Sequence, residues 1–225
     1  MNKTISIAID GPSGAGKSTI AKILAKELGY IYVDTGALYR TVGYAVLQNG
    51  IDPKNADAVE ALLPKITVSM GYVNDEQHVF LNGEDVNAYI RTPEVSMAAS
   101  TTSAMPSVRR FLFRLQQDTA KQNNVIMDGR DIGTVVLPFA SVKIFLTASA
   151  EDRAQRRYLE LCEKGMQVTF DEVLTDMKER DYNDSHRAAA PLKPADDAVL
   201  VDTSGNTLEQ SVSVLKSVIT KTLEG

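Results

Sequence analysis

The chain has 225 residues, 44% of them hydrophobic and 24% charged, and its formal net charge at pH 7 is −5. These are ordinary values for a globular protein, and the acidic balance argues against a general nucleic-acid-binding protein, which is usually basic. The length allows one large domain, or a core that carries inserted subdomains.

Cysteine content and hydropathy indicate in which cellular compartment the chain is expected. Cys162 is the only cysteine, so an intramolecular disulfide is excluded and a reducing compartment is expected; we expect this side chain to serve packing. No apolar stretch approaches the roughly 18 residues of a membrane span, and residues 1–4 lead into a strand pattern without a signal-peptide profile. We therefore expect a cytoplasmic protein without a membrane or nucleic-acid-polymer partner.

The first fifty residues alternate between strand and helix patterns. Residues 4–10 form a short β-rich run that ends at a glycine turn. Apolar residues at helical spacing predict a helix over 17–28 that stops at Gly29. A second strand follows over 30–34, and a second helix over 36–50.

The middle of the chain has a different pattern of predicted elements. Residues 66–90 alternate like two or three short antiparallel strands, with turns at Asn74-Asp75 and Asn82-Gly83. A single long helical pattern then runs from about Pro93 to Gln122.

The remaining third returns to alternating elements. Strand-like runs occupy 124–128, 142–148 and 198–203, with helical stretches between them and a final helix near 207–222. Strands that alternate with helices predict an α/β fold built on a parallel sheet, here with five strands. Residues 66–90 are interpreted as a small antiparallel insert.

The strongest motif is "GPSGAGKS", which matches the phosphate-binding pattern G-x-x-x-x-G-K-[S/T] between a predicted strand and a predicted helix. Its glycines let the backbone turn successive N–H groups toward an anion, and the helix N-terminus adds partial positive charge. Lys17 can reach the β- and γ-phosphates, and the Ser18 hydroxyl can bind Mg²⁺. The residues predicted to contact ATP are Gly11, Pro12, Ser13, Gly14, Ala15, Gly16, Lys17, Ser18 and Thr19. A glycine turn with an exposed lysine is the alternative, and the flanking elements argue against it.

Arginines gather where predicted elements meet turns. They are Arg40, Arg109, Arg110, Arg130, Arg153, Arg156, Arg157, Arg180 and Arg187. Phosphoryl transfer between two anions needs such an excess, because planar guanidinium groups bind phosphate in a bidentate manner and neutralise charge in the transition state. Any one of them is, on its own, more often a solvated surface charge or an ion-pair partner.

Three segments together resemble bacterial-type cytidylate kinases: "IAIDGPSGAGKSTIAKILAKELGYIYVDTGALYR", "MDGRDIGTVVLP" and "RDYNDSHRAAAPLKPA". The similarity runs nearly end to end. The resemblance implies a nucleoside monophosphate kinase with a P-loop core at 1–34 and 121–225. It also implies a monophosphate-binding subdomain at 35–120 that contains the 66–90 insert, and a short lid near 153–170.

The resemblance also implies a role for the charged stretch after strand 124–128. Asp128 is placed to hold Mg²⁺ together with Ser18, through water, and Arg130 to bind the acceptor phosphate. The alternative for Asp128 is an aspartate that stabilises the turn before Gly129. Asp131 is placed to read the base. A carboxylate accepts a hydrogen bond from the cytosine N4 amino group, whereas the oxygen that uracil carries there would repel it.

Further roles follow from the same resemblance. Ser100 and Arg109 would read the base, Arg109 being preferred to Arg110 because its neighbours match the family pattern in register. Thr35 and Arg40 would line the monophosphate pocket. Asp184 would accept from the ribose hydroxyls, with Arg180 and Arg187 flanking the sugar and phosphate; a solvated charge at a helix end is the alternative for Asp184. Arg153 and Arg157 would face the donor from the lid, although spacing does not decide between Arg156 and Arg157. The residues predicted to act in catalysis are Lys17, Arg130, Arg153, Arg157 and Arg187.

The residues and the resemblance together predict in-line phosphoryl transfer from ATP with Mg²⁺ to CMP, with UMP a poorer acceptor, by a monomeric enzyme. The resemblance implies that dCMP is also accepted. No general base is required, since a monophosphate oxygen is already a nucleophile. One alternative is a P-loop kinase for UMP or a hydroxylated metabolite. A nucleotide switch is the other, and the N-K-x-D motif of guanine-specific switches is missing from the sequence.

Overall fold

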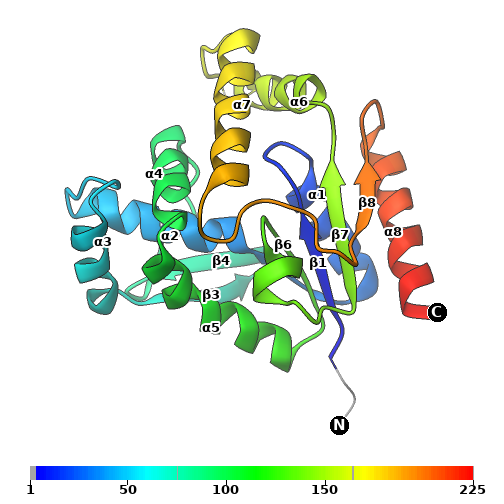
Figure 1. Ribbon diagram of the computed structural model, residues 1–225, viewed down its shortest axis with the longest axis horizontal. Coiled ribbons are helices and arrows are strands. Elements are labelled where there is room, and N and C mark those ends of the chain that lie inside the picture. The colour runs from blue at the N-terminus through cyan, green and yellow to red at the C-terminus, as the bar shows by residue number, and fades with distance from the viewer. Residues whose placement is uncertain (1–3, 75, 164, 225) are drawn as a thin grey trace. The chain divides into compact units, whose positions relative to one another are not determined.

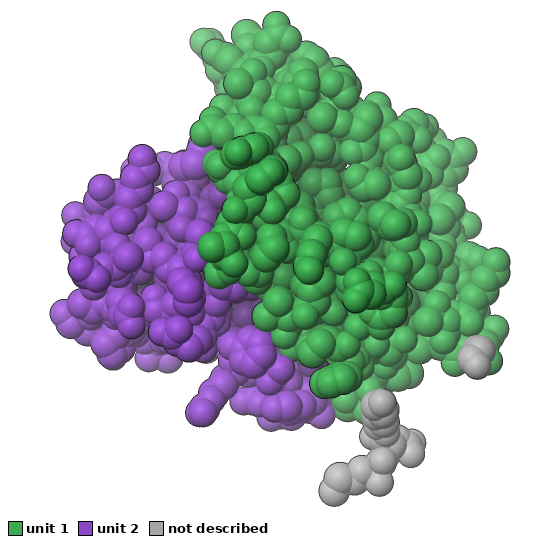
Figure 2. Space-filling view, in the orientation of Figure 1, with its two compact units in different colours: residues 1–32, 123–225 green, residues 33–122 purple. Residues whose placement is uncertain are grey.

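A computed structural model describes residues 4–74, 76–163 and 165–224. The described residues form two compact units (Figure 2), one within 4–32 and 123–224 and the other within 33–122. Asp75, part of a predicted turn, lies outside the described residues.

The first unit is built on a five-stranded sheet with the order β2-β6-β1-β7-β8, of which β6, β1, β7 and β8 are labelled in Figure 1. The last two residues of β2 already belong to the second unit. The strands are β1 (Ser6–Asp10), β2 (Ile31–Asp34), β6 (Val125–Gly129), β7 (Val142–Thr147) and β8 (Val199–Asp202). β1 pairs in parallel with both β6 and β7, and β7 pairs in parallel with β8. This arrangement confirms the predicted parallel α/β sheet.

Helices of the first unit bury the apolar faces that the sequence predicts. They are α1 (Lys17–Leu28), α6 (Ala150–Glu163), α7 (Phe170–His186) and α8 (Leu208–Glu224), with a short π-helix η2 (Ile132–Val136) after β6. Leu24 of α1 and Leu215 of α8 are fully buried in one cluster with strand residues such as Ile9 and Ile144. A separate cluster joins α6 to α7, which lie side by side in Figure 1.

The second unit combines helices with a three-stranded antiparallel sheet. Its elements are α2 (Thr35–Gln48), α3 (Ala56–Leu62), η1 (Leu63–Lys65), β3 (Val68–Val73), β4 (Glu76–Leu81), β5 (Glu84–Asp85), α4 (Pro93–Ser103) and α5 (Pro106–Gln122). The β4–β5 turn uses Asn82 (φ 52°) and Gly83 (φ 87°), as a tight hairpin turn requires. α2 packs closely on α4, since a Cβ on Gly43 would lie 2.8 Å from the backbone nitrogen of Ala99.

Two predictions fail here. The single helix expected over 93–122 is two helices, α4 and α5, because Pro106 has no backbone N–H to continue a helix and disfavours the helical conformation of the residue before it. Cys162 was expected to pack inside, yet it is exposed on α6. Within the described ranges, no helix is both long and apolar enough to cross a membrane.

Candidate functional site

The loop between β1 and α1 has the backbone geometry that its glycines permit. Gly11, Gly14 and Gly16 have φ angles of 151°, 74° and 84°, values that side chains with a Cβ rarely adopt. A Cβ on Gly11 would lie 1.9 Å from the carbonyl oxygen of Leu146 in β7. The loop therefore approaches the sheet so closely that only glycine fits at position 11.

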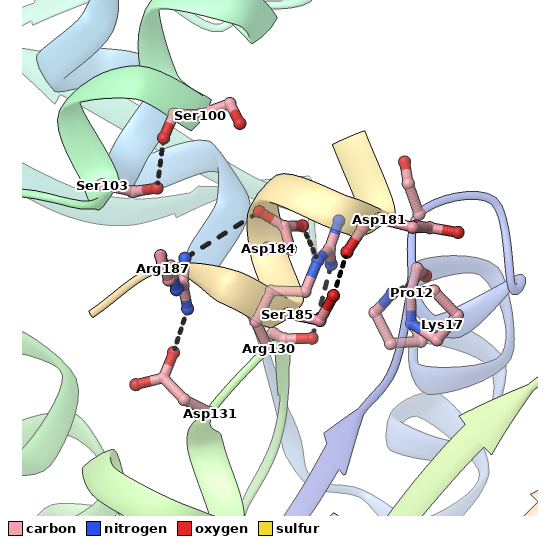
Figure 3. Close-up of polar contacts among 12 residues, drawn as sticks. Pro12, Lys17, Ser100, Ser103, Arg130, Asp131, Asp181, Asp184, Ser185 and Arg187 are labelled. Atoms are coloured by element: carbon pink, nitrogen blue, oxygen red, sulfur yellow. Dashed lines mark hydrogen bonds and ion pairs between the residues drawn. The ribbon is translucent and has the colours of Figure 1, made fainter. Parts of the chain in front are cut away.

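Lys17 begins α1 and is buried beneath this loop. Its Nζ donates to the carbonyl oxygen of Pro12 at 2.6 Å, drawn in Figure 3. Burial, assisted by Arg130, places the pKa of Lys17 well below its usual value, while Asp128 and Asp10 oppose that shift. A cation held this way at a helix N-terminus suits a polyphosphate, whose charge would favour the protonated amine.

Asp128 lies on β6 beside the start of α1. Its Oδ2 accepts from the Ser18 hydroxyl and its Oδ1 from the Tyr32 hydroxyl, both at 2.9 Å. The two predicted metal residues therefore lie within hydrogen-bond distance of each other. Among the described residues no group of three His, Cys, Asp or Glu side chains could hold a metal ion. A hydroxyl with one carboxylate still fits Mg²⁺, which is usually bound through one or two carboxylates together with substrate phosphates and water.

Arginine and aspartate side chains after β6 and at the C-terminal end of α7 form a buried network (Figure 3). Arg130 Nε donates to Asp184 Oδ2 at 2.8 Å, Arg187 Nη2 lies 3.4 Å from Asp131 Oδ1, and Arg187 Nη1 lies 4.0 Å from Asp184 Oδ1. Asp131 is 3% and Asp184 5% exposed, so the reading of Asp184 as a solvated helix-end charge is excluded.

The arginines of the network favour the ionised form of the Asp184 carboxylate. Burial acts to raise the pKa of Asp184, but Arg130, with smaller contributions from Arg180 and Arg187, lowers it below its usual value. Burial acts to lower the pKa of Arg130, but Asp184, with smaller contributions from Asp128 and Asp181, raises it above its usual value. Arg180 and Asp184 lie one turn apart near the end of α7, as their spacing requires, and Arg187 is the C-cap residue that follows the helix.

The arginines of α6 take different positions. Arg153 is buried, and its guanidinium contacts the Ser13 carbonyl at 2.9 Å and Asp181 of α7 at 2.7 Å. Nη1 of Arg156 would lie 4.0 Å from a Cβ added to Gly16, so this guanidinium lies beside the glycine loop. Arg157 instead pairs with Glu160 of its own helix at 2.8 Å. The structure thus brings Arg153 and Arg156, rather than Arg157, to the glycine loop.

In the second unit, Asp34 organises the "DTGALYR" segment. Its side chain caps α2 by accepting from the Ala37 N–H at 2.8 Å, and it also accepts from Arg40 at 3.0 Å and Arg91 at 3.2 Å. Burial acts to raise the pKa of Asp34, but the two arginines and the capping bond lower it. Thr35 is buried at the first position of the same helix.

The predicted base-reading residues of this unit converge on the end of α4. Ser103 Oγ donates to the Ser100 carbonyl at 2.9 Å (Figure 3). Arg109 Nη1 donates to the Ser103 carbonyl at 3.3 Å, with its guanidinium 5.6 Å from the centre of the Tyr39 ring. Arg110, by contrast, is largely exposed and lies 3.9 Å from Glu60 on the surface.

Comparison with known proteins decides the family, since the family model described as cytidylate kinase matches residues 7–221. The chain belongs to the cytidylate kinase family. A cytidylate kinase from Caldicellulosiruptor bescii is 53% identical over 208 residues, covering 92% of each chain. One from Bacillus cytotoxicus is 46% identical over 224 residues, covering 100% of each chain. The predicted resemblance and the predicted enzyme class, a nucleoside monophosphate kinase, are therefore confirmed.

The fold of this cytidylate kinase family member is shared more widely. A solved structure of a gluconokinase from Sinorhizobium meliloti aligns with 100% of this chain and over 96% of its own length, with a TM-score of 0.51 and 15% identity. At that identity the likeness concerns the fold alone, and it agrees with the predicted P-loop architecture.

Sequence reasoning missed several residues that hold the predicted ones in place. They are Asp10, Tyr32, Asp34, Arg91 and Asp181. Asp10 and Asp34 end parallel strands, where functional side chains of α/β sheets gather, so their position was a usable signal. Arg91 and Tyr32 carry no comparable signal, because each acts on a carboxylate distant in sequence.

Proposed function

We propose that this chain transfers the γ-phosphoryl group of ATP in line to CMP and dCMP, with UMP a poorer acceptor. Membership of the cytidylate kinase family supports the reaction. The observation that carries the base preference is the buried carboxylate of Asp131, held 3.4 Å from Arg187. A buried acceptor suits the N4 amino group of cytosine and opposes the carbonyl oxygen of uracil.

On the donor side, the glycine loop from Gly11 to Thr19 would cradle the phosphates and Lys17 would contact the β- and γ-phosphates. Ser18 and Asp128 would hold Mg²⁺, and their shared hydrogen bond at 2.9 Å supports this pairing. Bound Mg²⁺ would neutralise charge on the phosphates during transfer. The chain's own residues supply the rest of the positive field through the buried arginines.

On the acceptor side, Arg130 and Arg187 would bind the monophosphate while Asp184 orients Arg130 and accepts from the ribose. Arg180 would flank the same groups. In the second unit, Thr35 and Arg40 would contact the monophosphate, and Ser100 and Arg109 the base. A phosphate oxygen needs no base to attack, so positioning and charge neutralisation suffice for catalysis.

We further propose that residues 153–170 act as a lid whose closure excludes water. Arg153, which contacts the Ser13 carbonyl, would support the glycine loop. Arg157, whose side chain is 35% exposed, would reach the transferring group, with Arg156 as the alternative. The division into a core at 1–34 and 121–225 and an acceptor subdomain at 35–120, a monomeric state and a cytoplasmic location belong to the same proposal.

The test is ADP release from ATP and Mg²⁺ with CMP, dCMP, UMP, AMP or shikimate as acceptor. We expect turnover with CMP and dCMP and weaker turnover with UMP. In Asp131→Ala the preference for CMP over UMP should fall by about tenfold or more. Asp118→Ala, which removes an exposed carboxylate on α5, serves as the control and should keep the preference. Equal rates on CMP and UMP in the wild type would refute the base-reading role. Turnover on shikimate alone would favour a metabolite kinase, and no acceptor-dependent ADP would favour a nucleotide switch.

A further inference from the structure

Asp10, the last residue of β1, caps a helix that belongs to another part of the chain. Its side chain is buried, and each of its carboxylate oxygens accepts one backbone N–H at 2.7 Å, from Ile132 and from Gly133. These are the first two residues of the π-helix η2. The first N–H groups of a helix lack partners within it, and Asp10 supplies acceptors for both.

This arrangement changes what Asp131 can do. Asp131 is the N-cap residue of η2, a position at which an aspartate normally uses its own carboxylate to accept from the N–H groups of the first turn. Its side chain makes no such capping bond here and instead lies 3.4 Å from Arg187. Asp10 already occupies the N–H of Gly133, one of the two groups that such a cap would use, and the Asp131 carboxylate faces Arg187 instead.

The surroundings of Asp10 are built for close approach. A Cβ on Gly133 would lie 3.2 Å from Cδ of Lys143, a tight contact, and 3.4 Å from Asp10 Oδ2, an ordinary one, so a side chain at position 133 would press on Lys143 beside the capping bond. Burial raises the pKa of Asp10 to about 7, with a further increase from Asp131, while the two N–H bonds and Lys17 oppose the shift. Burying this carboxylate costs free energy, which its two hydrogen bonds offset in part.

We propose that Asp10 is a positioning residue for base selection: by capping η2 from β1, it frees the Asp131 carboxylate to face Arg187 and the nucleobase. This inference rests on the proposed role of Asp131. It assigns Asp10 no contact with either substrate, so its effect on selectivity must pass through Asp131.

A double-mutant cycle tests this dependence. The quantity measured is the ratio of kcat/KM for CMP to kcat/KM for UMP in wild type, Asp10→Asn, Asp131→Asn and the double variant. We expect Asp10→Asn to lower the ratio about tenfold, because an asparagine can accept only one of the two N–H bonds and η2 shifts. In the double variant the ratio should equal that of Asp131→Asn, since there is no carboxylate left to position.

Two further variants keep the test decisive. Gly133→Ala adds a methyl group that presses on Lys143 beside the capping bond; it moves the start of η2 without altering Asp10 and should also lower the ratio, so it replaces Asp10→Asn if that variant does not fold. Asp202→Asn changes an exposed aspartate at the end of β8 and should leave the ratio unchanged.

The outcomes separate the two proposals. If Asp131→Asn retains the wild-type ratio, the base-reading proposal fails, and the inference about Asp10 fails with it. If Asp131→Asn lowers the ratio but Asp10→Asn and Gly133→Ala do not, the inference about Asp10 is wrong and the proposed function stands. A rise in KM for ATP with an unchanged ratio would likewise overturn it, showing that Asp10 supports only the glycine loop.

Discussion

The hydroxyl of Tyr32 offers a single-atom test of how Asp128 is held. Tyr32 lies on β2, is 8% exposed, and donates to Asp128 Oδ1 at 2.9 Å while Ser18 donates to Oδ2. In Tyr32→Phe the ring stays in the core cluster of the sheet and only the donor is lost. The buried carboxylate oxygen then loses this hydrogen bond.

The expected magnitude follows from the burial and charge of this bond. A hydrogen bond to a charged group contributes about 1.5–3 kcal/mol, and we expect Tyr32→Phe to lose about that much unfolding free energy. For a chain of this size the loss corresponds to a fall in Tm of roughly 3–12 °C. Because Asp128 is less firmly oriented, the Mg²⁺ concentration for half-maximal activity should rise several-fold.

Urea unfolding followed by far-UV circular dichroism measures the first quantity, and ADP release against Mg²⁺ concentration measures the second. Tyr30→Phe is the matched control, because Tyr30 packs on the same cluster but is only partly buried. The reasoning is refuted if Tyr32→Phe and Tyr30→Phe have equal unfolding free energies and equal Mg²⁺ requirements.

Three further predictions concern the loop and its supports. Asp34→Asn keeps the α2 cap but loses the charge that faces two arginines. Since the folded pKa of Asp34 is lowered, the wild type should exceed the variant in unfolding free energy by about 1.5–3 kcal/mol above pH 5. Urea unfolding across pH should show this difference vanish as the pH falls below about 4. Gly11→Ala should abolish binding of a non-hydrolysable ATP analogue in calorimetry, because its Cβ would meet β7, whereas Gly29→Ala, with open space around it, should bind normally and lose only about 1–2 kcal/mol of stability. Arg153→Met should lower both Tm and ATP affinity, while Arg157→Met should lower kcat at unchanged Tm; the reverse pattern would exchange their proposed roles.

Local patterns predict the sheet well, because the strands of a buried parallel sheet are short apolar runs bounded by turns. All five strands lie within two residues of their predicted ends. The helix break before Pro106 was predictable from the rule for residues preceding proline, but the continuous helical spacing on both sides outweighed it. The exposure of Cys162 was not predictable, since residue type alone does not say which face of α6 packs on α7.

Local patterns say less about the residues that position the site. The motif around Lys17 and Ser18 is contiguous, so its spacing reveals it. The support of Asp128 by Tyr32 and of η2 by Asp10 spans 96 and more than 120 positions, and no local periodicity records such contacts. They arise only when the parallel sheet places the ends of β1, β2 and β6 at the same edge.

The pairing of arginines with aspartates in the first unit has a physical reason that the sequence pattern does not reveal. Arg130 and Arg180 lie near enough to Lys17 to repel its amine, and both lower its pKa. Three arginines of this unit are paired with carboxylates: Arg130 with Asp184, Arg153 with Asp181 and Arg187 with Asp131. Two of those carboxylates lie on α7, so this one helix supplies the countercharge that lets a dense set of cations fold together. A single charge change on α7 should therefore alter nucleotide binding and stability together, which separates this site from one whose arginines are merely solvated.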